Sequence, residues 1–224
     1  MSNEPSFSAP GSTARRPRAA RSAERAGKPE RAQGDKREKI LRAAVKVFAR
    51  KGFYATRVSE IAKAAGVADG TIYLYFENKD HVLISIFEDR ITRLIAVLRA
   101  EVDKPGTFEA RFRRIIELQL GLLDGQRDLA EVITVNLRQS SRLLKLHAAP
   151  LFTKYLDVFE GLIAEGQRQG AVRPDLSPRV ASRALWGALD GVAVTWAIGG
   201  GEPGALVRAA RQVGDVFLSG VLAR

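Results

Sequence analysis

The chain has 224 residues, enough for one mid-sized domain or two small ones, and its 46% hydrophobic and 27% charged residues are typical of a globular protein. It contains no cysteine and two histidines, so disulfides, thiolate sites and imidazole clusters are excluded, and we expect no metal, no cofactor and no catalytic residue. No apolar run approaches the roughly 18–20 residues of a membrane-spanning helix, and no secretory signal is recognisable. The sequence predicts a soluble, cytoplasmic protein without a membrane partner.

The net charge of +11 is concentrated towards the amino terminus. Residues 1–34 carry seven basic and three acidic residues, residues 35–81 carry ten and six, and residues 82–224 carry 19 and 16. The first two segments therefore each contribute +4, and the much longer third contributes +3. Basic density of this kind attracts polyanions, with nucleic acid the first candidate.

Residues 1–34 form a segment of distinct composition. They hold four of the nine prolines and almost no large apolar residue beyond Met1 and Phe7. Such a segment cannot bury enough surface to offset its ordering entropy, so we expect a disordered basic arm. The arm is either an inert tail or a nonspecific clamp on DNA phosphates.

The pattern becomes helical after this arm. Apolar residues recur at helix spacing over residues 35–51, and Asp35 is placed to cap that helix. Thr56 is the expected cap of a short second helix, and a tight turn through Gly66 leads into a third over residues 68–75.

The rest of the chain predicts helices with nothing strand-like between them. The five prolines outside the arm all fall at expected helix boundaries, which supports an all-α fold. These later helices are expected over residues 79–100, 107–124, 128–138, 150–169, 179–198 and 203–222.

Residues 56–76 carry the strongest functional signal. Two short helices joined by a glycine-containing turn form a helix-turn-helix, whose second helix can enter the major groove of DNA. Gly70 allows close approach of the backbone, Thr71 offers a hydroxyl and a methyl group, and the phenols of Tyr73 and Tyr75 can reach phosphates or base edges. The alternative is a structural helical hairpin with exposed tyrosines that does not bind DNA.

The segment GFYATRVSEIAKAAGVADGTIYLYFENKDHVL, residues 52–83, closely resembles the DNA-binding region of the TetR family of bacterial one-component repressors. The resemblance implies a TetR-like, all-α fold with a three-helix helix-turn-helix domain over residues 35–81. It further implies a helical ligand-binding and dimerisation domain over residues 82–224. A repressor of this kind binds palindromic double-stranded operator DNA as a homodimer.

The same resemblance assigns DNA contacts to two groups of residues. Asp69 stands where the family often has lysine, so it either accepts a hydrogen bond from cytosine or caps the helix. Bases are expected to be read by Ala68, Asp69, Gly70, Thr71 and Tyr73. Phosphates are expected to be contacted by Thr56, Arg57, Tyr73, Tyr75 and Lys79.

Further blocks extend the resemblance into the carboxy-terminal part. VADGTIYLYFENKD, NLRQSS at residues 136–141, GLIAEGQRQG and WGALDGVAVTW look like the TetR-type regulators of fatty acid degradation. Those repressors release DNA on binding long-chain acyl-coenzyme A (acyl-CoA), which makes this ligand the expected effector. The alternative is a repressor of an efflux pump that senses hydrophobic drugs.

An acyl-CoA site needs an apolar tunnel between helices and arginines for the phosphates of the head group. The polar run from residue 138 to 142 is the expected head-group site, because its hydrogen-bonding groups are dense at a helix end. Each apolar candidate could instead be ordinary core, and each arginine a solvated side chain. The expected ligand-binding residues are Phe112, Ile116, Val135, Arg138, Gln139, Arg142 and Phe159.

The last two predicted helices indicate an assembly role. Small residues, Gly187 and Gly191 among them, allow helices to approach closely, and Phe217 belongs to the apolar stripe of the final helix. The sequence therefore predicts an isologous four-helix dimer interface that includes these three residues. Asp190 lies in the same stretch, as either a structural carboxylate or a ligand contact.

Two other classes of protein compete with this interpretation. A helical-bundle enzyme is disfavoured, because no acid–base or metal constellation is present. A nonspecific nucleoid-binding protein would share the basic charge, but it would show little preference for one palindrome over random DNA.

Overall fold

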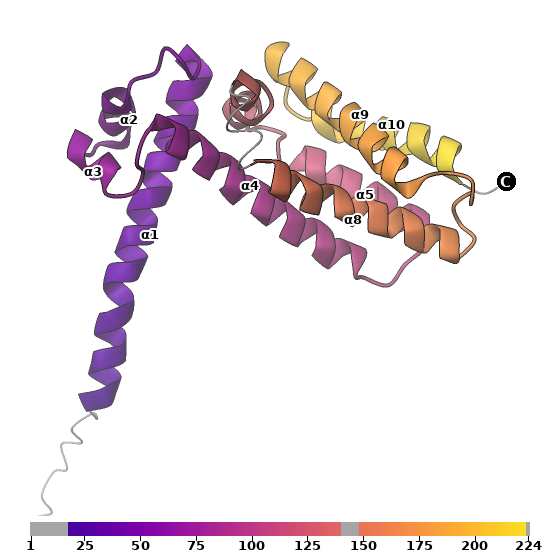
Figure 1. Ribbon diagram of the computed structural model, residues 1–224, viewed down its shortest axis with the longest axis horizontal. Helices are drawn as coiled ribbons and strands as arrows, with labels where there is room; N and C mark the ends of the chain where they lie inside the picture. The colour runs from indigo at the N-terminus through magenta and orange to yellow at the C-terminus, as the bar shows by residue number, and fades with distance from the viewer. Residues whose placement is uncertain (1–17, 140–147, 223–224) are drawn as a thin grey trace, which may run out of the picture. The chain divides into compact units, whose positions relative to one another are not determined.

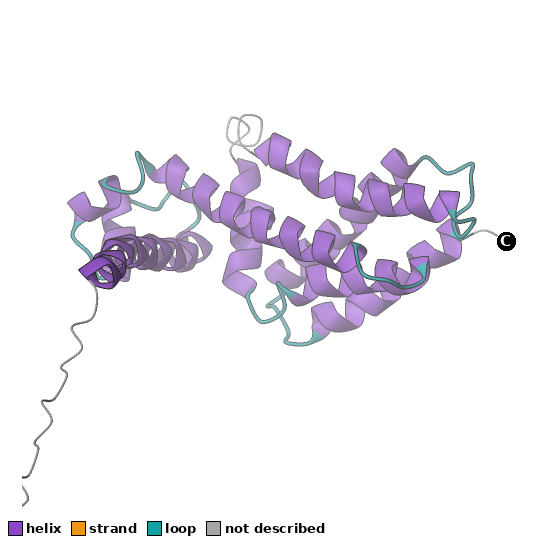
Figure 2. Cartoon of the chain, turned by 90° about the horizontal axis from the view of Figure 1, so that it is seen from below, coloured by secondary structure: helices purple, strands orange, loops and turns teal. Residues whose placement is uncertain are grey.

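The computed structural model describes residues 18–139 and 148–222, with side chains from residue 33 onward except that of Gln139. This part of the chain is helical, as the sequence predicts, and Figure 2 shows helices joined by loops and turns. Its one pair of bridged backbones is an isolated antiparallel bridge between Val172 and Leu222. None of the helices within the described ranges is long and apolar enough to cross a membrane.

The chain divides into two compact units, residues 1–38 and 39–224, and helix α1 (Arg18–Lys51) runs through the boundary. The helix expected to begin at residue 35 therefore begins at Arg18, and Asp35 lies inside it rather than capping it. Helix α1 thus includes residues 18–34 of the segment expected to form a disordered arm, while residues 1–17 lie outside the described part. The alanine, arginine and glutamate residues there favour helix, whereas Gly27 and Pro29 oppose it.

The carboxy-terminal half of α1 packs with α2 (Val58–Ala65) and α3 (Asp69–Tyr73), labelled in Figure 1. The turn between α2 and α3 passes through Gly66, whose φ of +63° lies in the left-handed region that glycine tolerates. The residue that caps α2 is Arg57, not Thr56. The core of this three-helix unit is built from buried side chains that include Ile40, Phe48, Ile61, Ile72 and Phe76.

The helices of the remaining chain, which we call the body, lie close to their expected positions. One element differs: the helix expected over residues 128–138 is a short α-helix followed by a π-helical turn and a 3₁₀ turn. The elements are α4 (Lys79–Val102), α5 (Phe108–Gly121), α6 (Arg127–Glu131), the π-helical η1 (Val132–Asn136), the 3₁₀ turn η2 (Leu137–Gln139), α8 (Ala149–Arg168), α9 (Pro178–Ile198) and α10 (Ala205–Val221).

The body is held together by helix packing around one apolar core. Helix α4 packs against α5 and α8, α8 against α9, and α10 against both α5 and α9. Thr107 and Ser177 cap α5 and α9, because their side-chain oxygens accept hydrogen bonds from backbone N–H groups of the first turn. The core includes Phe108, Phe112 and Phe159, all buried.

A partly buried ion pair joins α5 to α8. The Arg111 guanidinium donates to both carboxylate oxygens of Glu165, at 2.8 and 3.2 Å, and to the carbonyl oxygen of Val102 at 3.1 Å. The hydrogen bond from Arg111 lowers the pKa of the Glu165 carboxyl below its ordinary value. This pair therefore fixes the end of α4 and the α5–α8 contact together.

Candidate functional site

The helix-turn-helix presents most of the expected base-reading residues at the surface. Ile72 is buried and anchors α3 in the core, while Tyr73 beside it is 58% exposed. Thr71 is half-buried, and a Cβ added at Gly70 would meet open space. Ala68, Asp69 and Gly70 are exposed, as contact with a groove requires.

Two residues expected to contact phosphates face the protein instead. The hydroxyl of Thr56 donates to the carbonyl oxygen of Gly52 at 2.8 Å, and its side chain is buried. The Lys79 ammonium donates to the carbonyl oxygens of Phe53, Tyr54 and Thr56 at 2.8, 3.1 and 2.9 Å. An ammonium has three N–H groups, so all three serve the loop between α1 and α2. These side chains hold that loop in place.

Three phosphate candidates remain, and of these Tyr73 is exposed, as described above. Arg57 is exposed at the start of α2, where its backbone N–H donates to Glu60 at 3.0 Å. A hydrogen bond from Lys51 on α1 lowers the pKa of Glu60, so this carboxylate joins α1 to the start of α2. Tyr75 is half-buried directly after α3.

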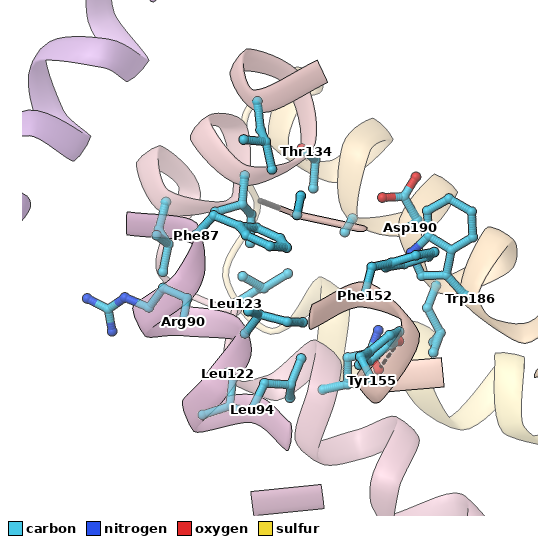
Figure 3. Close-up of a pocket in the computed structure, with 18 of the residues that line it drawn as sticks. Phe87, Arg90, Leu94, Leu122, Leu123, Thr134, Phe152, Tyr155, Trp186 and Asp190 are labelled. Atoms are coloured by element: carbon cyan, nitrogen blue, oxygen red, sulfur yellow. Dashed lines mark hydrogen bonds between the residues drawn. The ribbon is translucent and has the colours of Figure 1, made fainter. Parts of the chain in front are cut away.

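The body encloses a cavity of about 860 Å³, within the size range of small-molecule sites. Its walls come from α4, from the segment between α5 and η2, and from α8 and α9. The lining is mostly apolar, and Figure 3 shows the side chains of Phe87, Leu94, Leu122, Leu123, Phe152 and Trp186 among it.

The polar groups inside the cavity pair with one another. Arg138 contacts the Asp190 carboxylate at 2.6 Å, and its guanidinium lies 5.9 Å from the centre of the Trp186 ring. The Tyr155 hydroxyl donates to Gln119 at 2.7 Å, and burial raises the pKa of this phenol. The tyrosine therefore stays a neutral donor, and the cavity offers a largely apolar interior.

One edge of the cavity is open to solvent and basic. Val97 on α4 and Leu122 after α5 line the cavity, yet they are 38% and 43% exposed. Arg90 and Arg93 lie on the same stretch of α4, and both approach Asp89, at 3.8 and 3.0 Å. Two guanidinium groups thus share one carboxylate beside the opening, and we call Arg90 and Arg93 the cavity rim.

The structure places the expected ligand-binding residues in different surroundings. Arg138 lines the cavity, but Phe112, Ile116 and Phe159 lie in the body core and Val135 is not part of the lining. Those four residues lie outside the lining of this cavity, because helix periodicity identifies a buried face but not whether that face meets another helix or an empty space. The side chain of Gln139 and the whole of Arg142 lie outside the described residues.

The structure supplies lining residues that the sequence did not single out, such as Arg90, Leu122 and Trp186. No local signal marks them, since each belongs to a different element. Among the described residues, no three histidine, aspartate or glutamate side chains converge as metal ligands would.

The outer face of α9 combines small and apolar residues with the polar side chains of Arg183 and Thr195. Gly187 and Gly191 are exposed with open space beside each, and Val180 and Ile198 at the helix ends are 63% and 66% exposed. Phe217 is half-buried and packs against the body core. The exposed large apolar side chains of α10 are Val207 and Val216, at 40% and 72%.

Comparison with known proteins extends these observations. Residues 40–86 match the family model described as "Bacterial regulatory proteins, tetR family", and residues 87–220 match "YsiA-like protein, C-terminal region". The chain is 34% identical over 182 residues to the fatty acid metabolism regulator protein of Bacillus subtilis, covering 81% of this chain and 93% of that protein.

Two solved structures are similar at the same identity. The fatty acid degradation regulator FadR from Bacillus halodurans gives a TM-score of 0.78 at 34% identity, covering 83% of this chain and 95% of that one. FadR from Bacillus subtilis, solved in complex with stearoyl-CoA, gives a TM-score of 0.76 at 34% identity, covering 82% and 98%.

Proposed function

The chain belongs to the TetR family of bacterial DNA-binding regulators, and we propose that it is a homodimeric repressor of fatty acid degradation genes that long-chain acyl-CoA releases from DNA. The observation that supports acyl-CoA as the effector is the apolar cavity with its basic rim. It lies in a chain 34% identical to a regulator solved with stearoyl-CoA. The repressor would act in the cytoplasm, where operator and effector are both present.

The proposed DNA-binding domain comprises residues 35–81. Asp69, Gly70, Thr71 and Tyr73, with Ala68 at the start of α3, would face the base edges in the major groove. Arg57 and Tyr75 would contact phosphates on either side. Thr56 and Lys79 support the same surface from behind, since they hold the loop that precedes α2.

The proposed dimer joins two copies through the outer face of α9 and the exposed side of α10. The exposed glycines on α9 allow another helix to approach closely, and the apolar residues at its ends gain burial in such a contact. A two-fold axis through this face would place two recognition helices about 34 Å apart, one turn of DNA. The matching operator is a palindrome.

The body, residues 82–224, would bind the effector. Its apolar interior suits a hydrocarbon chain, because the polar side chains there already satisfy one another. The phosphates of coenzyme A would fit Arg90 and Arg93 at the rim, where two guanidinium groups lie beside the Asp89 carboxylate. Arg138, the earlier head-group candidate, is already neutralised by Asp190.

Titration of the operator complex tests this function. Stearoyl-CoA should release a fluorescent operator, stearic acid should act more weakly because it lacks the phosphates, and coenzyme A alone should not act. To convert mostly bound DNA into mostly free DNA, the ligand must prefer the released state by about 5 kcal/mol. If none of the three releases DNA and a hydrophobic cationic drug does, the efflux-pump alternative replaces this proposal.

A further inference from the structure

A buried hydrogen bond connects the cavity wall to the helix-turn-helix. The side-chain oxygen Oδ1 of Asn136 accepts from the backbone N–H of Phe53 at 2.8 Å. Asn136 is 2% exposed, and Phe53 is buried as well. The bond joins residues 83 positions apart in the chain, so it is a tertiary contact and no part of a helix.

The Asn136 end of this bond belongs to the cavity wall. Asn136 closes the π-helical turn η1, and its neighbours Ile133, Thr134 and Leu137 all line the cavity. Its amide also donates to the carbonyl oxygen of Glu131 at 3.4 Å, which ties the side chain to the same turn. Turns of π-helix are marginal in geometry and frequent at functional sites. A ligand that moves this wall therefore moves Asn136.

The Phe53 end belongs to the loop that leads into α2. Phe53 follows Gly52, where α1 ends with a φ of +78°. Its carbonyl oxygen accepts from Lys79 at 2.8 Å, and the Lys79 ammonium lies 4.6 Å from the centre of its ring. Phe53 is thus the point where the cavity wall, the start of α4 and the loop before α2 meet. Helix α2 in turn packs against the recognition helix α3.

Resting on the proposed function, we propose that Asn136 is the positioning residue that transmits occupancy of the cavity to the DNA-binding domain. With the cavity empty, Asn136 holds Phe53 and the loop before α2 in the DNA-binding arrangement. A ligand pressing on Ile133 and Thr134 displaces η1, the bond to Phe53 is lost, and α2 and α3 lose their fixed orientation. Helix α4 provides a second connection between the cavity and the DNA-binding domain, because it lines the cavity and begins at Lys79.

The first test measures coupling, as the ratio of operator Kd with and without saturating stearoyl-CoA, by anisotropy at fixed salt. Asn136→Leu keeps the size of the side chain but removes the acceptor, and we expect this ratio to fall about fivefold, the scale of one buried hydrogen bond. Stearoyl-CoA affinity of the DNA-free protein should stay within twofold of wild type.

Ser182→Ala is the matched control. Ser182 is buried on α9, and its hydroxyl donates to the Arg179 carbonyl oxygen at 3.0 Å, outside both the cavity lining and the helix-turn-helix. It removes one buried hydrogen bond without touching the proposed connection, so its coupling ratio should equal that of wild type.

A second measurement needs no variant. Hydrogen exchange of the wild-type peptide containing Phe53 should quicken when stearoyl-CoA is added. Unchanged exchange during release, or wild-type coupling in Asn136→Leu, overturns the role of Asn136 and leaves the proposed function standing. A wild-type protein that keeps its operator in saturating stearoyl-CoA overturns both.

Discussion

On α3 the side chains of Asp69 and Tyr73 face solvent, whereas in the body the buried Tyr155 donates its hydroxyl hydrogen to Gln119 in the cavity wall. The two regions handle polar groups in opposite ways because their proposed partners differ. A surface that reads DNA must leave donors and acceptors exposed for base edges and phosphates. A cavity for hydrocarbon must satisfy its polar groups internally, since an unpaired buried polar group costs free energy and would oppose an apolar ligand.

The two regions also differ in where their supporting residues lie. Behind the DNA-binding surface, Thr56 and Lys79 stabilise a loop through backbone carbonyls. In the body, the Arg111–Glu165 pair joins helices that are distant in sequence. Substitutions can therefore alter the exposed contact surfaces and the internal pairs separately, and the largest effect is expected at the proposed dimer surface.

Gly191→Leu tests whether the outer face of α9 is a contact surface like that of α3. Leucine would overpack the interface, at about 1–3 kcal/mol per site, and each dimer carries the substitution twice. We expect the dimer to be weakened by about 2–6 kcal/mol and monomers to appear in sedimentation velocity at micromolar concentration.

Gly161→Leu provides the comparison for that experiment. Gly161 is exposed in the middle of α8 with open space beside it, like Gly191. This variant should sediment as the wild-type dimer. Equal sedimentation of both variants would remove α9 from the interface.

Tyr73→Ala tests the exposed surface of the helix-turn-helix. Because Tyr73 is 58% exposed, its loss should leave folding intact. Operator binding should weaken by about 1–3 kcal/mol, roughly tenfold to hundredfold, in anisotropy titrations at fixed salt. Tyr73→Phe separates the hydroxyl from the ring. Wild-type operator affinity in the alanine variant would contradict the proposed reading surface.

Glu165→Gln tests an internal pair. It leaves the buried Arg111 without its carboxylate, and partial exposure of Glu165 limits the expected loss of unfolding free energy to about 1–2 kcal/mol at neutral pH. Since Arg111 lowers the pKa of Glu165, the stabilisation is present above the ordinary glutamate pKa and is lost as the pH falls through the lowered value. The difference between variant and wild type should therefore shrink in acid, as measured by urea unfolding.

Asp175→Asn supplies the surface counterpart. Arg173 and Asp175 form an exposed ion pair two residues apart, and Arg173 lowers the pKa of Asp175. Solvent screens such a pair, so urea unfolding should show little change. A larger loss for Asp175→Asn than for Glu165→Gln would reverse the assigned importance of the two pairs.

The helix-turn-helix could be located from the sequence, because it is contiguous and its turn depends on Gly66. What the sequence did not show there is the direction in which two side chains point. Thr56 and Lys79 have side chains chemically suited to phosphate, and nothing in their spacing shows that both turn towards carbonyl groups of the loop. In the body, the helices were predicted, but the sequence could not separate core from cavity lining, since Phe112 and Phe159 in the core share the apolar pattern of the lining.

Helix periodicity, caps, prolines and glycines are local properties, so the sequence by itself determined the all-α fold, the order of the helices and the helix-turn-helix. The tertiary structure alone decided which apolar faces close against one another and which enclose a cavity. It also decided that Asn136 meets Phe53 across 83 positions of chain. Such contacts depend on the relative placement of several helices, and a one-dimensional pattern carries no information about that placement.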